Sequence, residues 1–188
     1  MKNFDEKKWI KDIDNLRVEK DKWMKHSPNS PIPHEIRHRM KGLEYFPSDL
    51  KYRFEVKLNI YSNPEKLIMA TSKGQQREYV RYGFFEFVVE SETQRIQVYK
   101  TIPKHEHGHS HEGESLFIPF RDSTSGKESY GAARYIDLEM SPSGLYTLDF
   151  NLAYNPYCVY NDNYVCPFPP PENWLQIPIR AGEKNFKK

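Results

Sequence analysis

Four of the seven histidines stand at alternate positions of one short polar segment, at His105, His107, His109 and His111. In an extended chain this spacing places all four imidazoles on one face. Neutral imidazole binds Zn and other divalent transition metals, so an ion could be held here. A catalytic ion also needs neighbours that fix its ligands, which a segment rich in Gly, Ser and Glu does not supply. We favour a solvated loop that takes up metal only when it is offered, with a functional metal site as the alternative; no cofactor is required.

A second histidine pattern occurs at residues 34–38, HEIRH. It has the H-E-x-x-H spacing of zinc proteases, in which the two histidines bind zinc and the glutamate acts as general base. The segment follows Pro33 directly, carries charge on all sides, and has no candidate third ligand at the usual downstream spacing. We therefore expect an ordinary solvated face of a short helix.

The two cysteines, Cys158 and Cys166, lie eight residues apart in a proline-rich segment. They could form a disulfide, ligate a metal, or stay reduced as small buried side chains. The absence of a C-x-x-C pair gives no support for a thioredoxin-like role. We favour buried thiols, because free cysteines are commonly buried and disulfides are disfavoured without an export signal.

The densest group of polar side chains lies at residues 119–137 and includes Arg121, Asp122, Lys127, Tyr130 and Arg134. Its Ser-Gly-Lys triplet lacks the spacing of a phosphate-binding loop. The arginines could pair with nearby aspartates and hold a turn together. They could instead converge on an anionic ligand, which guanidinium groups bind well. Both interpretations stay open, and the residues slightly favour the structural one.

Helical periodicity is confined to the N-terminal part of the chain. The first 25 residues predict an amphipathic helix with Trp9, Ile13, Leu16 and Trp23 on its buried stripe. The prolines of residues 27–33 end that helix, and a short second helix is predicted over residues 33–40.

From residue 52 onward the pattern favours strands. The predicted strands span residues 52–60, 67–71, 77–90, 94–102, 115–120, 133–138, 145–151 and 174–179. Asn63-Pro64 is predicted to form a turn, and Gly83 a bulge. Residues 154–173 are too rich in Pro and Asn for regular structure and predict a long ordered loop. The predicted fold is mainly β, an antiparallel sandwich or partly closed barrel of about eight strands with the N-terminal helices packed on it.

Composition limits the class of protein. A chain of 188 residues suits a single domain, here an N-terminal helical segment over 1–42 and a β core over 52–180. The formal net charge of +2 argues against nucleic-acid binding. No apolar stretch is long enough to span a membrane, and the N-terminus has no secretory h-region, so we expect a cytoplasmic protein that binds no membrane.

The C-terminal half carries a longer signature. Residues 117–139 (FIPFRDSTSGKESYGAARYIDLE) and 148–184 (LDFNLAYNPYCVYNDNYVCPFPPPENWLQIPIRAGEK) resemble the bacterial and archaeal domain of unknown function 1684 family, as does GLEYFP at 42–47. The resemblance covers nearly the whole chain and brings no established activity. It implies that the polar residues of the signature form one shared site or scaffold, and both histidine motifs depart from its usual pattern.

Together these features favour a β-rich module with a polar pocket for a small anionic ligand, lined by the 121–134 turn and the 149–166 loop. The candidate ligand-binding residues are Arg121, Asp122, Lys127, Tyr130, Arg134, Asp149, Asn151 and Asn155. The alternatives are a metal-assisted hydrolytic enzyme and a structural or partner-binding protein without activity.

Overall fold

The computed structural model describes residues 4–102 and 115–186. The predicted metal site at His105–His111 lies outside these residues, so it stays a prediction.

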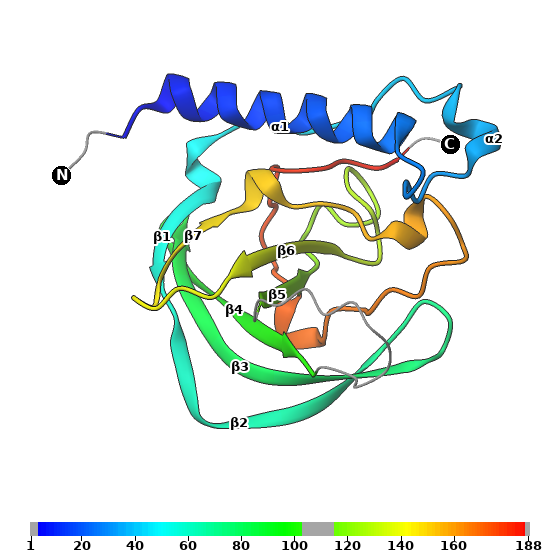
Figure 1. The fold of residues 1–188 in the computed structure, drawn as a ribbon. Coiled ribbons are helices and arrows are strands. Elements are labelled where there is room, and N and C mark those ends of the chain that lie inside the picture. Colours follow the sequence, from blue (N-terminus) through cyan, green and yellow to red (C-terminus); the bar gives the residue numbers. More distant parts are fainter. Residues whose placement is uncertain (1–3, 103–114, 187–188) are drawn as a thin grey trace.

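The larger sheet is an antiparallel meander, in which each strand pairs with the next in the chain (Figure 1). Its five strands are β2 (Asn59–Ala70), β3 (Gln76–Val89), β4 (Glu92–Thr101), β5 (Ser115–Phe120) and β6 (Arg134–Glu139). A second sheet pairs β1 (Arg53–Lys57) with β7 (Leu145–Asp149). The mainly β, antiparallel class is therefore confirmed, as two sheets that do not close into a barrel over the described residues.

Aromatic rings fill the space between the two sheets. Phe54 of β1 lies 4.8 Å, centroid to centroid, from Phe87 of β3, and Phe150 contacts both of these rings. Phe85 of β3 packs against Tyr146 of β7 at 5.3 Å. Such tilted and edge-on ring pairs stabilise a core beyond the area that they bury.

The first part of the meander differs from prediction. Residues 59–70 form one strand, and Asn63-Pro64, predicted as a turn, lies inside it at a register shift. Proline is tolerated there because β2 is an edge strand and the shift leaves its missing N–H without consequence. The predicted irregularity at Gly83 is confirmed, since a Cβ there would lie 2.4 Å from the carbonyl oxygen of Asn59.

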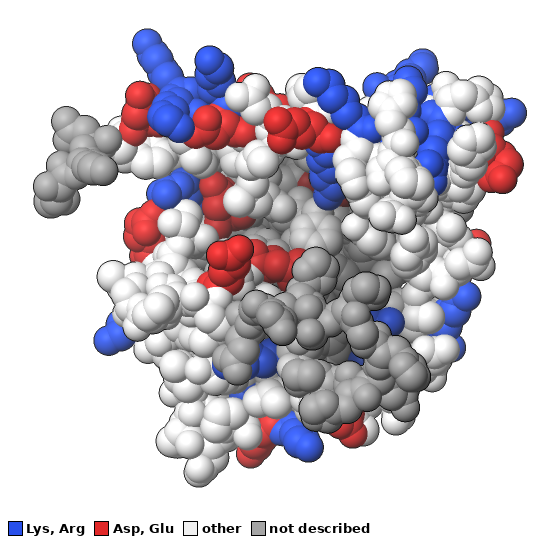
Figure 2. Space-filling view, viewed as in Figure 1, with Lys and Arg blue, Asp and Glu red and all other residues white. Residues whose placement is uncertain are grey.

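Helix α1 (Glu6–His26) lies across the sheets, with the short α2 (His34–Arg37) beyond its C-terminal end (Figure 1). The predicted buried stripe is only partly correct: Ile13 is buried, but Leu16 and Trp23 are exposed. The face turned to the protein instead includes Arg17, which lies over the Tyr45 ring, and Lys20, which pairs with the buried carboxylate of Glu183. Figure 2 shows both signs of charge mixed along α1.

The predicted strand over 174–179 is wrong. This segment makes a single parallel bridge, from Trp174 to Arg121, and its polar backbone groups are satisfied one by one. The buried Asn173 side chain accepts from the Gln97 amide at 2.7 Å and donates to the carbonyls of Gln97 and Pro119. Between β7 and this segment the chain forms three 3₁₀ turns, Phe150–Leu152, Tyr157–Val159 and Pro171–Asn173. Side-chain hydrogen bonds thus take the place of a strand ladder.

No helix of the described residues is long and apolar enough to cross a membrane.

Candidate functional site

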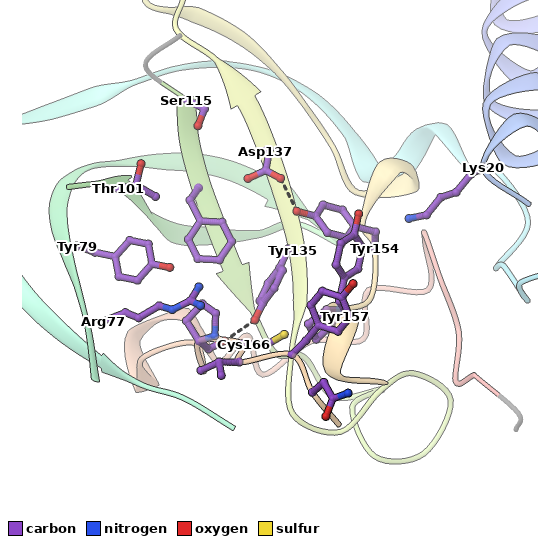
Figure 3. A pocket seen from close by; sticks show the side chains of 16 residues that line it. Lys20, Arg77, Tyr79, Thr101, Ser115, Tyr135, Asp137, Tyr154, Tyr157 and Cys166 are labelled. Carbon is purple, nitrogen blue, oxygen red and sulfur yellow. Dashed lines mark hydrogen bonds between the residues drawn. The ribbon is translucent and has the colours of Figure 1, made fainter. Parts of the chain in front are cut away.

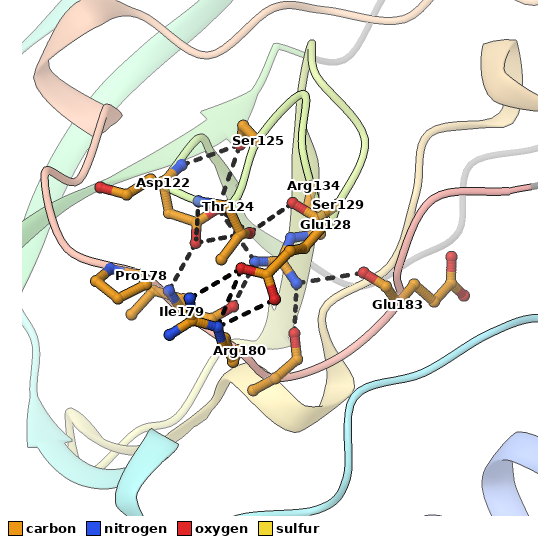
Figure 4. A network of polar contacts seen from close by, with 12 residues as sticks. Asp122, Thr124, Ser125, Glu128, Ser129, Arg134, Pro178, Ile179, Arg180 and Glu183 are labelled. Carbon is orange, nitrogen blue, oxygen red and sulfur yellow. Dashed lines mark hydrogen bonds and ion pairs between the residues drawn. The ribbon is translucent and has the colours of Figure 1, made fainter.

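Arg134 does not reach solvent. It is 1% exposed, and its guanidinium pairs with Asp122 at 3.2 Å (Figure 4). It also donates to the carbonyls of Ile179 (2.8 Å), Ala181 and Glu183 (3.3 Å). Burial lowers the pKa of Arg134, and the Asp122 carboxylate opposes that shift. The arginine therefore fixes the C-terminal segment to the start of β6.

The carboxylate oxygens of Asp122 accept hydrogen bonds from several parts of the chain. Its carboxylate accepts from the Thr124 hydroxyl at 2.9 Å, the Ser125 hydroxyl at 3.2 Å and the Ile179 amide at 2.6 Å, in addition to Arg134. The protein itself therefore supplies hydrogen-bond donors to both carboxylate oxygens, without any ligand.

The predicted residues of the loop lie in a second group beneath α1. Asp149 accepts from the Trp9 indole at 2.9 Å and from the Asn151 amide at 2.9 Å. The Asn151 side chain bonds both backbone groups of Asp49. Asn155 donates its side-chain amide to the Lys184 carbonyl at 2.9 Å. These contacts attach the helix and the C-terminus to β7.

The remaining three predicted residues each have different surroundings. Arg121 stacks over the Trp174 ring at 4.9 Å, Lys127 is exposed, and Tyr130 lies near the Cys158 sulfur. The structure therefore divides the eight predicted ligand-binding residues between internal networks and separate surface positions. Anion binding by them stays a prediction.

A cavity of about 750 Å³ opens beside these networks, under the 154–167 segment (Figure 3). It is lined by the ends of β3, β4, β5 and β6, by that segment, and by Lys20 of α1. The loop thus contributes to a pocket as predicted, whereas the 121–134 turn does not. None of the eight predicted residues is among the described residues that line it.

Aromatic side chains are the most frequent type in the cavity wall, six of the sixteen residues that line it. Five of them are tyrosines: Tyr79, Tyr135, Tyr154, Tyr157 and Tyr164. They are joined to Phe117 and to one another by ring contacts, with Tyr79 stacked on Phe117 at 5.4 Å and Tyr157 edge-on to Tyr164 at 5.2 Å. Rigid rings with polar tips offer both stacking surface and hydrogen bonds to a ligand.

Two positively charged side chains lie in the cavity wall, and they differ in their contacts. The Lys20 ammonium lies 2.6 Å from the buried Glu183 carboxylate and 4.9 Å from the Tyr154 ring centroid. Arg77 is exposed, lies near the Tyr79 hydroxyl, opposes the rise in the pKa of Tyr79 that burial causes, and has no ion pair among residues 4–102 and 115–186. Arg77 is thus the positively charged side chain of the cavity wall that has no carboxylate partner among the described residues.

One carboxylate lies on the opposite wall. Asp137 of β6 accepts from the Tyr154 hydroxyl through Oδ2, and Figure 3 shows its other oxygen directed into the cavity. Although its surface is open to the cavity, the enclosing protein raises the pKa of Asp137, and the Tyr154 bond opposes that shift. The two walls therefore present opposite charges.

The H-E-x-x-H residues form a surface hollow with Lys25, His26 and Arg37. The helix has only four residues, and Arg37 is occupied by the carbonyls of Ser27, Ser30 and Ile32. Within the part of the chain that the structure describes, no three His, Cys, Asp or Glu side chains form a group that could hold a metal ion.

The sequence analysis missed Lys20, Arg77 and Asp137 as site residues. Each is one charge in an otherwise ordinary amphipathic or alternating pattern, so no local motif marks it. The concentration of tyrosines at 154–164 was the available signal for the aromatic wall.

Comparison with known proteins places this architecture in a family. No curated protein matches the chain. The solution NMR structure of an uncharacterised protein of Haloarcula marismortui is similar to it, with 35% sequence identity, a TM-score of 0.69 and 95% of each chain covered. The family model for proteins of unknown function DUF1684 matches residues 38–184. The chain therefore belongs to the DUF1684 family.

Proposed function

We propose that the protein binds a small ring-containing anion in the tyrosine-lined cavity. The observation that carries the proposal is Arg77, an exposed guanidinium that stands in an aromatic wall without a carboxylate partner among the described residues. Guanidinium forms strong, directional bonds to carboxylate and phosphate, and the rings beside it suit a planar ligand.

Asp137 on the opposite wall adds a preference for a hydrogen-bond donor at the other end of the ligand. The free oxygen of Asp137 would accept from a ligand hydroxyl, amine or ring N–H. A ligand with an anionic group at one end and a donor at the other matches both walls. The cavity volume of about 750 Å³ lies in the range of small-molecule sites.

A pair of isosteric probes tests the charge preference: 2-naphthoate, which is anionic, and the neutral 2-naphthamide, each titrated calorimetrically into the full chain. We expect the carboxylate to bind about tenfold more tightly, since one charge-assisted hydrogen bond contributes ~1.5 kcal/mol or more. Arg77→Gln should remove this difference. Arg39→Gln, an exposed arginine outside the cavity, should leave it unchanged.

Two results would contradict the proposal. One is that neither probe binds, or that both bind equally well. The other is an equal loss in the two arginine variants, which would show that only the overall charge of the protein matters.

We also propose a cytoplasmic location. Both cysteines are free thiols, which fits a reducing compartment. Fractionation of the source cells, with blotting of cytosol and periplasm, tests it.

A further inference from the structure

Cys158 and Cys166 lie next to each other in space. The Cys158 amide donates to the Cys166 sulfur at 3.3 Å, so the Cys166 side chain lies against residue 158. Both are free thiols; Cys158 is half-buried and Cys166 is buried. A disulfide needs two sulfurs that can approach without backbone rearrangement, and the amide–sulfur contact brings the two residues together.

The surrounding backbone gives the two sulfurs unequal freedom. Cys166 is attached to the end of β2, because its carbonyl accepts from the Ser72 amide at 2.9 Å and its amide donates to the Ser72 hydroxyl at 3.2 Å. Cys158 lies in the 3₁₀ turn Tyr157–Val159 and is the more accessible of the two. An accessible thiol beside a fixed, buried one is the arrangement of an attacking and a resolving cysteine.

The Cys166 thiol and the hydroxyls of Tyr130 and Ser72 lie near the Cys158 sulfur. The Cys166 thiol bond is the largest of the effects that lower the pKa of Cys158 to about 6; burial opposes the shift, and the hydroxyls assist it. The pKa of Cys166 is raised, first by its bond to Cys158 and then by burial. The other titratable or charged groups near this cluster include Asp162, which acts on Tyr130, Arg77, which acts on Cys166, and Tyr135 and Tyr79, which face the thiols from the sheet.

We propose that Cys158 and Cys166 form a thiol–disulfide exchange site for low-molecular-weight disulfides. The Cys158 thiolate attacks one sulfur of the small disulfide, whose S–S bond breaks and releases one thiolate. That thiolate takes the proton of Cys166, and the Cys166 sulfur then attacks Cys158. The intramolecular disulfide forms and the second small thiolate leaves. The two cysteines lose two electrons together, and the small disulfide is reduced to two thiols.

Oxidised glutathione is the probe, and the intact mass of the reduced full chain is the measurement. The wild-type chain should lose two hydrogens and retain no glutathione. Cys166→Ser should instead accumulate a single glutathione adduct at Cys158. Cys158→Ser should react about tenfold or more slowly, because its remaining thiol is buried and has a raised pKa.

Three results would contradict the assignment of Cys158 as the attacking thiol and Cys166 as the resolving thiol: the wild-type chain does not react, both cysteines retain glutathione, or the two serine variants react equally fast. Unchanged thermal unfolding of both variants shows that the mass result reports on the folded chain. The outcome is independent of the naphthoate titration, since no step uses the ligand of the cavity.

The pH dependence provides a second readout. The rate at which iodoacetamide alkylates Cys158 should rise through about pH 6, well below the ordinary thiol range. Tyr130→Phe removes one of the hydroxyls that lower the pKa of Cys158 and should move this midpoint upward, whereas Tyr157→Phe, in the same turn as Cys158, should not. A wild-type midpoint in the ordinary thiol range, or equal profiles in the two variants, would contradict the assigned arrangement.

Discussion

The Arg134–Asp122 network and the tyrosine-lined cavity are both rich in polar and charged side chains, but they use them in opposite ways. In the network each charge meets a partner inside the protein, and Arg134 is 1% exposed. In the cavity, Arg77 and one oxygen of Asp137 are left without a partner among the described residues. Polar density alone therefore does not locate a binding site; what matters is which polar groups the fold leaves unsatisfied.

The strongest test of this contrast removes the centre of the network. Arg134→Met leaves Asp122 buried without its cation and frees three carbonyls, so we expect the free energy of unfolding to fall by about 3–5 kcal/mol. Arg180→Met breaks the exposed pair with Glu128 and should cost less than about 1 kcal/mol. Urea denaturation of both variants measures the difference. Equal effects would mean that the network does not hold the C-terminal segment.

A second comparison uses two asparagines of the same irregular region. Asn173→Ala leaves the amide of Gln97 and the carbonyls of Gln97 and Pro119 unsatisfied, which should lower the free energy of unfolding by about 2–4 kcal/mol. Asn163 lines the cavity with an exposed side chain, so Asn163→Ala should change it by less than about 0.5 kcal/mol. Thermal unfolding distinguishes the two; a larger loss at Asn163 would reverse the assignment of roles.

The smallest expected effect concerns Asp137. A carboxyl whose pKa is raised on folding binds its proton more tightly in the native state, so its contribution to stability falls as the pH rises above its unfolded value. Asp137→Asn should therefore stabilise the protein at neutral pH, by less than about 1 kcal/mol because the group is open to cavity water. The gain should vanish in acid, where both proteins are neutral at this position.

Unfolding measured at several pH values follows this difference, with Asp162→Asn in the same loop region as the control. A variant that is equally or less stable at neutral pH would show that Asp137 is not held in an enclosing wall.

The sequence by itself determined the antiparallel meander, the irregularity at Gly83 and the ordered proline-rich loop. These depend on local chemistry: alternation along a strand, a residue without Cβ at a close approach, and prolines that cannot join a ladder. The family signature was equally readable, and residues 38–184 match its model.

Only the tertiary structure decided which polar residues are satisfied. Arg121 and Arg134 look alike in sequence, but one stacks over Trp174 and the other is enclosed by carbonyls from residues 179–183. The face of α1 that is turned to the protein likewise depends on Glu183, which pairs with Lys20 and lies 163 positions after it in the chain. Such partners are distant in sequence, so local periodicity cannot reveal whether a charge is compensated, exposed to solvent or open to a ligand.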